Sequence, residues 1–355
     1  MLSVFKQWVQ RYLSDPQAIL LIVLLGGSLL LFMCMGRILA PMIASVVIAY
    51  LLEWFANLLV KLRIPRNAAM VISYGTFLGL FLSAIFILWP IIWQQLLRLY
   101  EEIPSMILGI QHFFTLLPEK FPEFLTKETV EGWVSSFLVQ VKQSGKVLFT
   151  VSIATLPAVI ALIVYLVLVP LMVFFFLKDR YVITRWLSNF LPNDRRLLVK
   201  VWKEVDEQIG NYIRGKVAEV VIVGMATYIL FYFFELRYAI LMAVLVGFSV
   251  LIPYIGAALV TIPVVLVAFF QWGLGHEFAY LILCYGILMT LDGIILVPLL
   301  FSEAVSLHPV AIIIAVLVFG GWWGFWGVFF AIPLATLVKA LIDAWPRGKP
   351  IKHKS

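Results

Sequence analysis

Long runs of apolar residues alternate with shorter polar segments along the whole chain, and this pattern predicts a bundle of membrane-spanning helices. An α-helix needs about 20 residues to cross the hydrocarbon core of a bilayer. Candidate spans cover residues 18–35, 38–60, 68–92, 148–177, 217–236, 238–270, 278–300 and 310–342. The pattern therefore predicts an all-α, polytopic helical membrane protein with about eight membrane segments.

Two of these runs, 238–270 and 310–342, are longer than one crossing requires and contain residues that disturb helices. The residues are Pro253, Gly256 and Pro263 in the first run, and Gly320, Gly324, Gly327 and Pro333 in the second. A broken helix in lipid leaves amides and carbonyls unpaired, so it is tolerated only where protein or a water-filled cavity supplies partners. Both runs are therefore expected to form discontinuous helices or re-entrant hairpins, of the kind that transporters place beside their substrates.

The expected substrate pathway is a cavity lined by these two broken stretches, with Tyr254 as a polar lining group and Asp292 nearby. Asp292 is the one carboxylate deep in a predicted span, and His308 is a second candidate for binding an ion or a proton. Structural roles are the alternatives. The prolines can bend a helix, and the glycines can allow close packing. Asp292 can form a hydrogen bond to a helix end, and His308 can be an ordinary polar residue of a surface loop.

Composition agrees with a membrane protein, since 63% of the residues are hydrophobic and 13% are charged. The net charge of +7 comes mostly from short loops and the C-terminal tail. We interpret these bases as setters of membrane orientation rather than as a nucleic-acid surface. The two cysteines, Cys34 and Cys284, lie in apolar runs and indicate neither a disulfide framework nor a metal site.

Basic loops favour the cytoplasm, which places residues 61–66, 178–216 and both termini inside and residues 93–147 outside. The expected regions are 1–92 with the N-terminal spans, 93–147 with extracytoplasmic amphipathic helices, 148–177 with the fourth span, 178–216 with a cytoplasmic amphipathic helix, 217–344 with the C-terminal membrane core, and 345–355 with a basic tail. The last three runs can all cross, or both long ones can dip in and return, because an odd number of crossings must remain.

Charged residues near the ends of spans are expected to lie at the water boundary. Glu53 can reach Lys61 or water, and residues 178–180 end the fourth span. Arg214 and Lys216 are expected to start the fifth span in the same way, with Glu219 one turn further in as a partner for one of them.

No enzyme motif is present. His276 and Glu277 lack the second histidine of a zinc-protease helix, and the chain has no phosphate-binding loop and no serine nucleophile elbow. Asp292 has no aspartate partner within a span for protease chemistry. The chain is therefore expected not to be an enzyme and to need no cofactor or metal.

Five stretches carry a family resemblance by their order and spacing. They are ILAPMIASVVIAYLLEW (38–54), VPLMVFFFLKDR (169–180), NYIRGK (211–216), LVGFSVLIPYIGAALVTIP (245–263) and LDGIILVPLLFSEAVSLHPVAIIIAVLVFGGWWGFWGVFFAIPLATLVKAL (291–341). Together they resemble the autoinducer-2 exporter family of permeases, in its PerM-like branch. The resemblance covers nearly the whole chain.

The resemblance implies a bacterial inner-membrane protein with cytoplasmic termini that assembles as a homo-oligomer, a pentamer in particular. It also implies export of a small solute such as a signalling molecule, and the PerM-like branch leaves the substrate unassigned. Sodium–proton exchange, which the family also includes, is the alternative. A third hypothesis is a non-transporting oligomeric membrane scaffold built through residues 93–147 and 181–216. The expected partners are a small molecule or ion and the lipid bilayer.

Overall fold

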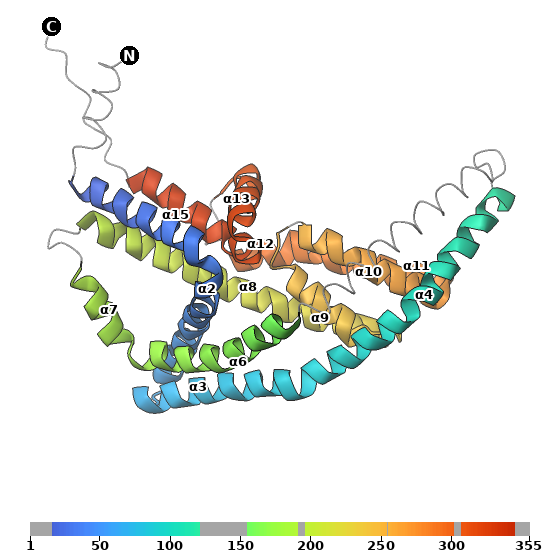
Figure 1. Cartoon of the computed structure of the whole chain (residues 1–355), viewed down its shortest axis with the longest axis horizontal. Coiled ribbons are helices and arrows are strands. Elements are labelled where there is room, and N and C mark those ends of the chain that lie inside the picture. The colour runs from blue at the N-terminus through green and yellow to red at the C-terminus, as the bar shows by residue number, and fades with distance from the viewer. Residues whose placement is uncertain (1–15, 121–154, 191–195, 254, 302–306, 345–355) are drawn as a thin grey trace, which may run out of the picture.

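The computed structural model describes residues 16–120, 155–190, 196–253, 255–301 and 307–344, and this part of the chain is helical throughout (Figure 1). Its N-terminal half comprises α2 (Pro16–Lys61), α3 (Arg66–Ser83), the π-helix η1 (Ala84–Leu88), α4 (Trp89–Lys120), α6 (Thr155–Lys178) and α7 (Arg180–Ser188). Its C-terminal half comprises α8 (Arg196–Phe233), α9 (Ala239–Ser249), α10 (Ile255–Trp272), α11 (His276–Leu291), the π-helix η2 (Asp292–Leu296), α12 (Val297–Phe301), α13 (Pro309–Trp323), α14 (Phe325–Phe329) and α15 (Ala331–Ala344).

The described residues contain five helices that are long and apolar enough to cross a membrane, or six if one bent pair counts as a span. That pair is residues 162–178 and 180–188, whose axes differ by 75°. Two shorter apolar helices, Ala239–Ser249 and Pro309–Trp323, are the first halves of the two long runs. An all-helical membrane protein is therefore confirmed.

Two predicted element boundaries are wrong because the helices run straight through them. The first two predicted spans form one helix, α2, with Pro41 inside it and no loop near residue 37. The third predicted span continues past residue 92, since α3, η1 and α4 follow one another without a break. Hydropathy shows where an apolar run ends, but a helix continues for as long as its backbone keeps the helical conformation and hydrogen bonds.

Both over-long runs are broken, and the positions of the breaks can now be assigned. Between α9 and α10, residues 250–253 are not helical, and α10 turns back alongside α9 (Figure 1). The second run breaks at Gly324, which has φ +59°, and again at Phe330. Pro263 was expected to disturb the first run, but it lies inside the continuous helix α10. Pro333 is the third residue of α15, where the missing N–H costs nothing.

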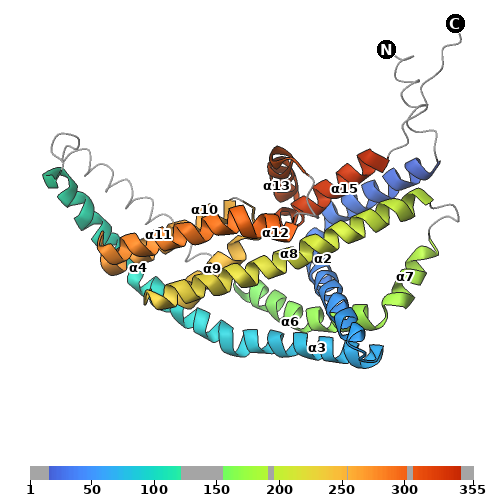
Figure 2. The ribbon, with the colours of Figure 1, turned by 180° about the vertical axis from the view of Figure 1, so that it is seen from behind.

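The apolar core surrounds α8 and the broken stretches. One cluster joins α8 to α9, α10 and α11 through buried side chains such as Val223, Val246, Val264 and Leu281. α8 and α9 approach closely, since a Cβ at Gly247 would lie 3.1 Å from the Cα of Gly224. Figure 2 shows α8 running the length of the molecule between α2 at one end and α9 at the other. α8 is thus the helix against which the C-terminal half packs.

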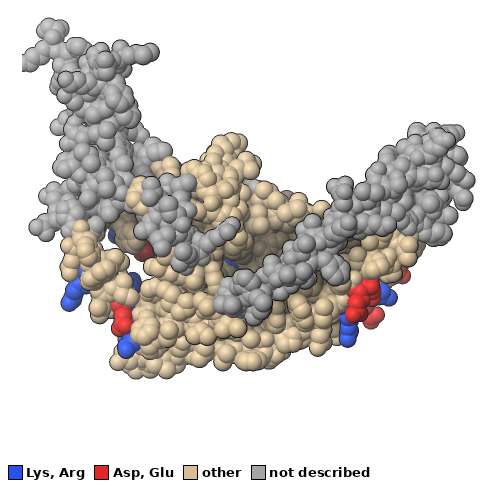
Figure 3. Space-filling model, viewed as in Figure 1, with Lys and Arg blue, Asp and Glu red and all other residues tan. Residues whose placement is uncertain are grey.

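Charged side chains gather at the two ends of the elongated molecule. On the face in Figure 3 the most prominent charged side chains lie near α7 and near α4, and most of the described surface between them is uncharged. At the α4 end, Arg237 forms an exposed ion pair with Glu102, with 3.5 Å between their nitrogen and oxygen atoms. A wide uncharged band between two charged ends is typical of a protein whose middle lies in lipid.

Candidate functional site

In each broken stretch one glycine packs directly against the preceding helix. A Cβ at Gly256 would overlap the carbonyl oxygen of Ser249, and a Cβ at Gly327 would overlap the carbonyl oxygen of Phe319. Both glycines are buried. Close packing, which was one of the two interpretations of these glycines, is therefore a direct consequence of the backbone geometry.

Lys216 on α8 bonds a carbonyl group at the first break that accepts no other backbone hydrogen bond among the described residues. Its Nζ donates a hydrogen bond of 2.8 Å to the carbonyl oxygen of Val250, the residue that follows α9. It also lies 5.2 Å from the centre of the Phe301 ring. Because the last carbonyls of a helix lack partners within it, a buried cation at this position satisfies a group that lipid could not.

Glu219 completes a buried ion pair with Lys216. Lys216 Nζ donates to Glu219 Oε2 at 2.7 Å, and the two residues are 4% and 2% exposed. The predicted pairing of Glu219 with a nearby base is confirmed. The prediction that Lys216 lies at the water boundary is wrong, because α8 continues on both sides of it and packs against α9 and α12.

Tyr212 lies one turn before Lys216 and contacts the second broken stretch. Its hydroxyl donates a hydrogen bond of 3.1 Å to the carbonyl oxygen of Phe329, the last residue of α14. The Tyr212 side chain is buried, with its ring 5.7 Å from that of Phe301. Residues 212, 216 and 219 follow helical spacing, so one face of α8 reaches both breaks.

Asp292 lies beside this face, at the start of the π-helix η2. It interacts electrostatically with Lys216 and with Glu219. Its Oδ1 atom is buried and has no hydrogen-bond partner among the described residues. Single π-turns inside α-helices occur frequently at functional sites. We call Lys216, Glu219 and Asp292 the α8 charge cluster.

A cavity of about 510 Å³ adjoins Asp292 between α8 and α11. Its walls are apolar apart from Asp292 and include Val223 and Ala226 from α8 and Cys284 and Leu288 from α11. Of the predicted pathway residues, Asp292 is the one that lines this cavity. Asp292 thus interacts electrostatically with Lys216, the residue that bonds the first break, and the cavity lies further along α8.

The other predicted site residues occupy the breaks or their flanks. Pro253 is half-buried in the first break, and Tyr254 lies outside the described residues. Gly320 is half-buried against Val328, and His308 accepts a hydrogen bond of 3.3 Å from the N–H of Val310. That bond makes the exposed His308 ring the cap of α13.

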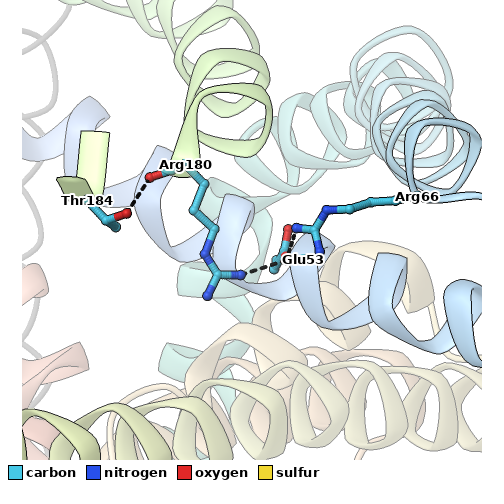
Figure 4. Close-up of polar contacts among 4 residues, drawn as sticks. All are labelled: Glu53, Arg66, Arg180 and Thr184. Carbon is cyan, nitrogen blue, oxygen red and sulfur yellow. Dashed lines mark hydrogen bonds and ion pairs between the residues drawn. The ribbon is translucent and has the colours of Figure 1, made fainter. Parts of the chain in front are cut away.

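A second charged group connects α2, α3 and α7 at one end of the molecule (Figure 4). Glu53 Oε1 accepts from Arg66 at 2.9 Å and from Arg180 at 2.6 Å. Lys61 was one expected partner, but the structure brings these two arginines to Glu53 instead. Arg180 is the first residue after the 75° bend, so this group holds α7 against the end of α2. Both arginines are about half exposed, which makes each ion pair weak.

Sequence reasoning missed Tyr212 and Lys216 as site residues. Tyr212 fell within the predicted cytoplasmic amphipathic segment 178–216, and Lys216 was expected at the water boundary at the start of the fifth span. The signal that could have found them is the continuation of that segment's apolar stripe, since residues 212, 216, 219 and 223 lie on one helical face that extends into the apolar run.

Comparison with known proteins places the described geometry in a family context. The sequence matches the family model described as "AI-2E family transporter" over residues 18–347. It is 47% identical over 350 residues to "Putative permease PerM" of Escherichia coli (strain K12), covering 98% of this chain and 99% of that protein. It is 27% identical over 313 residues to "Putative transport protein YueF" of Bacillus subtilis (strain 168), covering 84% and 82%. The family match over residues 18–347 includes both breaks and the α8 charge cluster.

Proposed function

The chain belongs to the AI-2E family of transporters, and from this premise we propose that it is a multi-pass permease of the bacterial inner membrane that exports a small solute at the α8 charge cluster. Family membership confirms the resemblance drawn from the sequence motifs. We propose that the protein transports its solute without chemical change and therefore is not an enzyme. The proposed substrate is a small solute, and the proposed direction is out of the cell.

The observation that carries the proposal is the contact of one helix face with both breaks. Tyr212 bonds Phe329, and Lys216 bonds Val250, so α8 cannot shift without exchanging both bonds. Transporters open alternately to the two sides by moving one group of helices against another around a fixed site. A helix that bonds two discontinuous stretches is well placed to couple their movements.

Burial of the α8 charge cluster also supports the proposal. Removing two charges from water costs several kcal/mol per ion, so a buried ion pair rarely exists for stability alone. Ionisable groups within membrane segments mark substrate or ion paths far more often than ordinary packing. The cluster combines a buried pair with a third charged residue whose Oδ1 lacks a partner among the described atoms.

Cation–proton exchange is the second candidate, and the unpartnered Oδ1 of Asp292 favours it. With Lys216, Glu219 and Asp292 in their ordinary ionised forms, the cluster carries one excess negative charge. Such a site can accept a cation or a proton. Under this alternative, reconstituted protein acidifies or alkalinises vesicles when a sodium gradient is imposed, and Asp292→Asn removes the response.

The placement of the ends supports cytoplasmic termini. The start of α2 and the end of α15 lie at the same end of the molecule in Figures 1 and 2, as α7 does. α7 belongs to the basic segment 178–216, which was predicted to lie inside. The proposal includes a homo-oligomer, which the family resemblance suggested.

Reconstitution into proteoliposomes tests the proposal. Vesicles loaded with a panel of radiolabelled small solutes, including polyhydroxylated and amine compounds, are expected to release at least one of them. Asp292→Asn and Gly256→Leu should abolish release, whereas Gly286→Leu should not, since no atom lies within 4 Å of a Cβ placed at Gly286. Release of no solute, or release unaffected by both site variants, would favour the scaffold hypothesis.

A further inference from the structure

The cavity between α8 and α11 has the dimensions and the lining of a ligand site. At about 510 Å³ it falls within the range of about 300–1,000 Å³ that small-molecule sites occupy. Such sites are mostly apolar, with a few polar groups that orient the ligand. Here the apolar walls are Val223, Ala226, Cys284 and Leu288 among others, and the polar group is Asp292.

The carboxylate of Asp292 sets the chemistry of the ligand. Its Oδ1 is buried without a partner among the described residues, and leaving such an acceptor unpaired costs about 1–3 kcal/mol. The nearby cation, Lys216, already donates to Glu219 and to Val250. Glu219 adds a further negative charge next to Asp292. A positively charged hydrogen-bond donor would satisfy the orphan oxygen, and an anion would be repelled.

The rim of the cavity indicates the route of entry. Ile222 on α8 and Ile287, Leu291 and Ile295 on the opposite wall are between 45% and 56% exposed. These side chains belong to helices that qualify as membrane spans. The cavity therefore opens sideways onto a surface that lipid tails would cover, and a solute that partitions into the bilayer could enter without crossing water.

We propose that this cavity binds an amphipathic cation, with its apolar body between α8 and α11 and its protonated amine at the carboxylate of Asp292. The inference rests on the proposed function and names the substrate class of the same site. Such a ligand would compensate the excess negative charge of the α8 charge cluster while it is bound.

Cys284 offers a direct reporter because it lines the cavity. In a Cys34→Ala background it is the one remaining thiol of the chain. The rate of its modification by N-ethylmaleimide is measured by intact mass in detergent, with octylammonium, octanol or octanoate added. These probes share one apolar chain and differ only in their head group. At about ten times its dissociation constant, octylammonium should slow modification about tenfold, and octanoate should not slow it.

Three variants make the result specific. Asp292→Asn should abolish protection by octylammonium, and Ala226→Phe, which fills the cavity from the opposite wall, should do the same. A reporter on α13, Leu317→Cys in a chain without Cys34 and Cys284, should show no protection, since that exposed position lies away from the cavity. Equal protection by all three probes, no protection by octylammonium, or protection that survives in both cavity variants would overturn the inference.

The permease proposal and the inference about the cavity can be tested independently of each other. If reconstituted protein releases solutes in an Asp292-dependent way but octylammonium gives no protection of Cys284, the inference about the cavity is wrong and the permease proposal stands. If octylammonium protects Cys284 but no solute is released, the cavity binds amphipathic cations and the permease proposal is wrong.

Discussion

The break after α9 and the break after α14 lie in stretches that pack in the same way, yet different side chains satisfy their free carbonyls. In both stretches a buried glycine lies against a carbonyl of the preceding helix, Gly256 on Ser249 and Gly327 on Phe319. At the first break the partner of the free carbonyl is the cation of Lys216, and at the second it is the neutral hydroxyl of Tyr212.

This difference separates what a broken membrane helix needs from what a functional site adds. A neutral hydroxyl is enough to satisfy one carbonyl, and the second break uses nothing more. The first break uses a lysine, which then requires Glu219 to balance its charge in an apolar surrounding. Since the simpler solution exists in the same chain, we attribute the charged one to transport and the neutral one to structure.

The largest expected effect comes from Lys216→Met. This change leaves Glu219 as an uncompensated buried charge and removes the donor to Val250, so the free energy of unfolding should fall by about 3–5 kcal/mol. Thermal melting in one fixed detergent measures the loss. The double variant Lys216→Met/Glu219→Leu should recover most of it. A single variant as stable as the wild-type protein would show that the pair is not formed.

Gly256→Ala and Gly327→Ala come next and test whether the two breaks share their packing. Each added methyl must displace a backbone carbonyl, which should cost about 1–3 kcal/mol in stability. Gly286→Ala is the control, because the same methyl meets open space in the helix α11 and should be neutral or slightly stabilising. A large cost at one break and none at the other would disprove the shared geometry.

Tyr212→Phe should have a smaller effect, since it removes a single neutral hydrogen bond to Phe329. The expected loss of stability is about 1 kcal/mol. Tyr232→Phe, at a position that is 70% exposed, should change nothing. The comparison fails if Tyr212→Phe destabilises the protein as much as Lys216→Met does.

The smallest effect is expected at Glu53, outside both breaks. Glu53→Gln weakens ion pairs to two half-exposed arginines, and such pairs contribute about 0–1 kcal/mol. Its melting temperature should stay close to that of the wild-type protein at high salt, where surface ion pairs are screened. A loss comparable to that of Lys216→Met would show that the end of α2 matters as much as the core.

Composition and apolar run length were sufficient to predict the fold class and the two broken stretches. Glu219 could be paired with a base because residues three apart on a helix are neighbours. The carbonyl partners of Tyr212 and Lys216 could not be predicted, since Phe329 and Val250 lie 117 and 34 residues away. Such contacts depend on how helices pack, which a single sequence does not encode locally.

The errors at helix boundaries have a physical origin as well. Pro263 lies within α10 because neighbouring groups can satisfy the carbonyl that a proline leaves free. Arg214 and Lys216 were expected at the water boundary because the apolar run of the fifth predicted span begins at residue 217. In the structure α8 extends on both sides of residue 217, and its packing against α9 and α12 brings Lys216 into the core.

Transport by the double variant Lys216→Met/Glu219→Leu tests most directly whether the charges at the first break serve transport. The variant replaces the buried pair with apolar side chains, so it can fold while the charges are absent. In proteoliposomes, with the solute that the wild-type protein releases, the variant should show no release, and Tyr212→Phe should retain it. Release at the wild-type rate from a folded double variant would contradict the account.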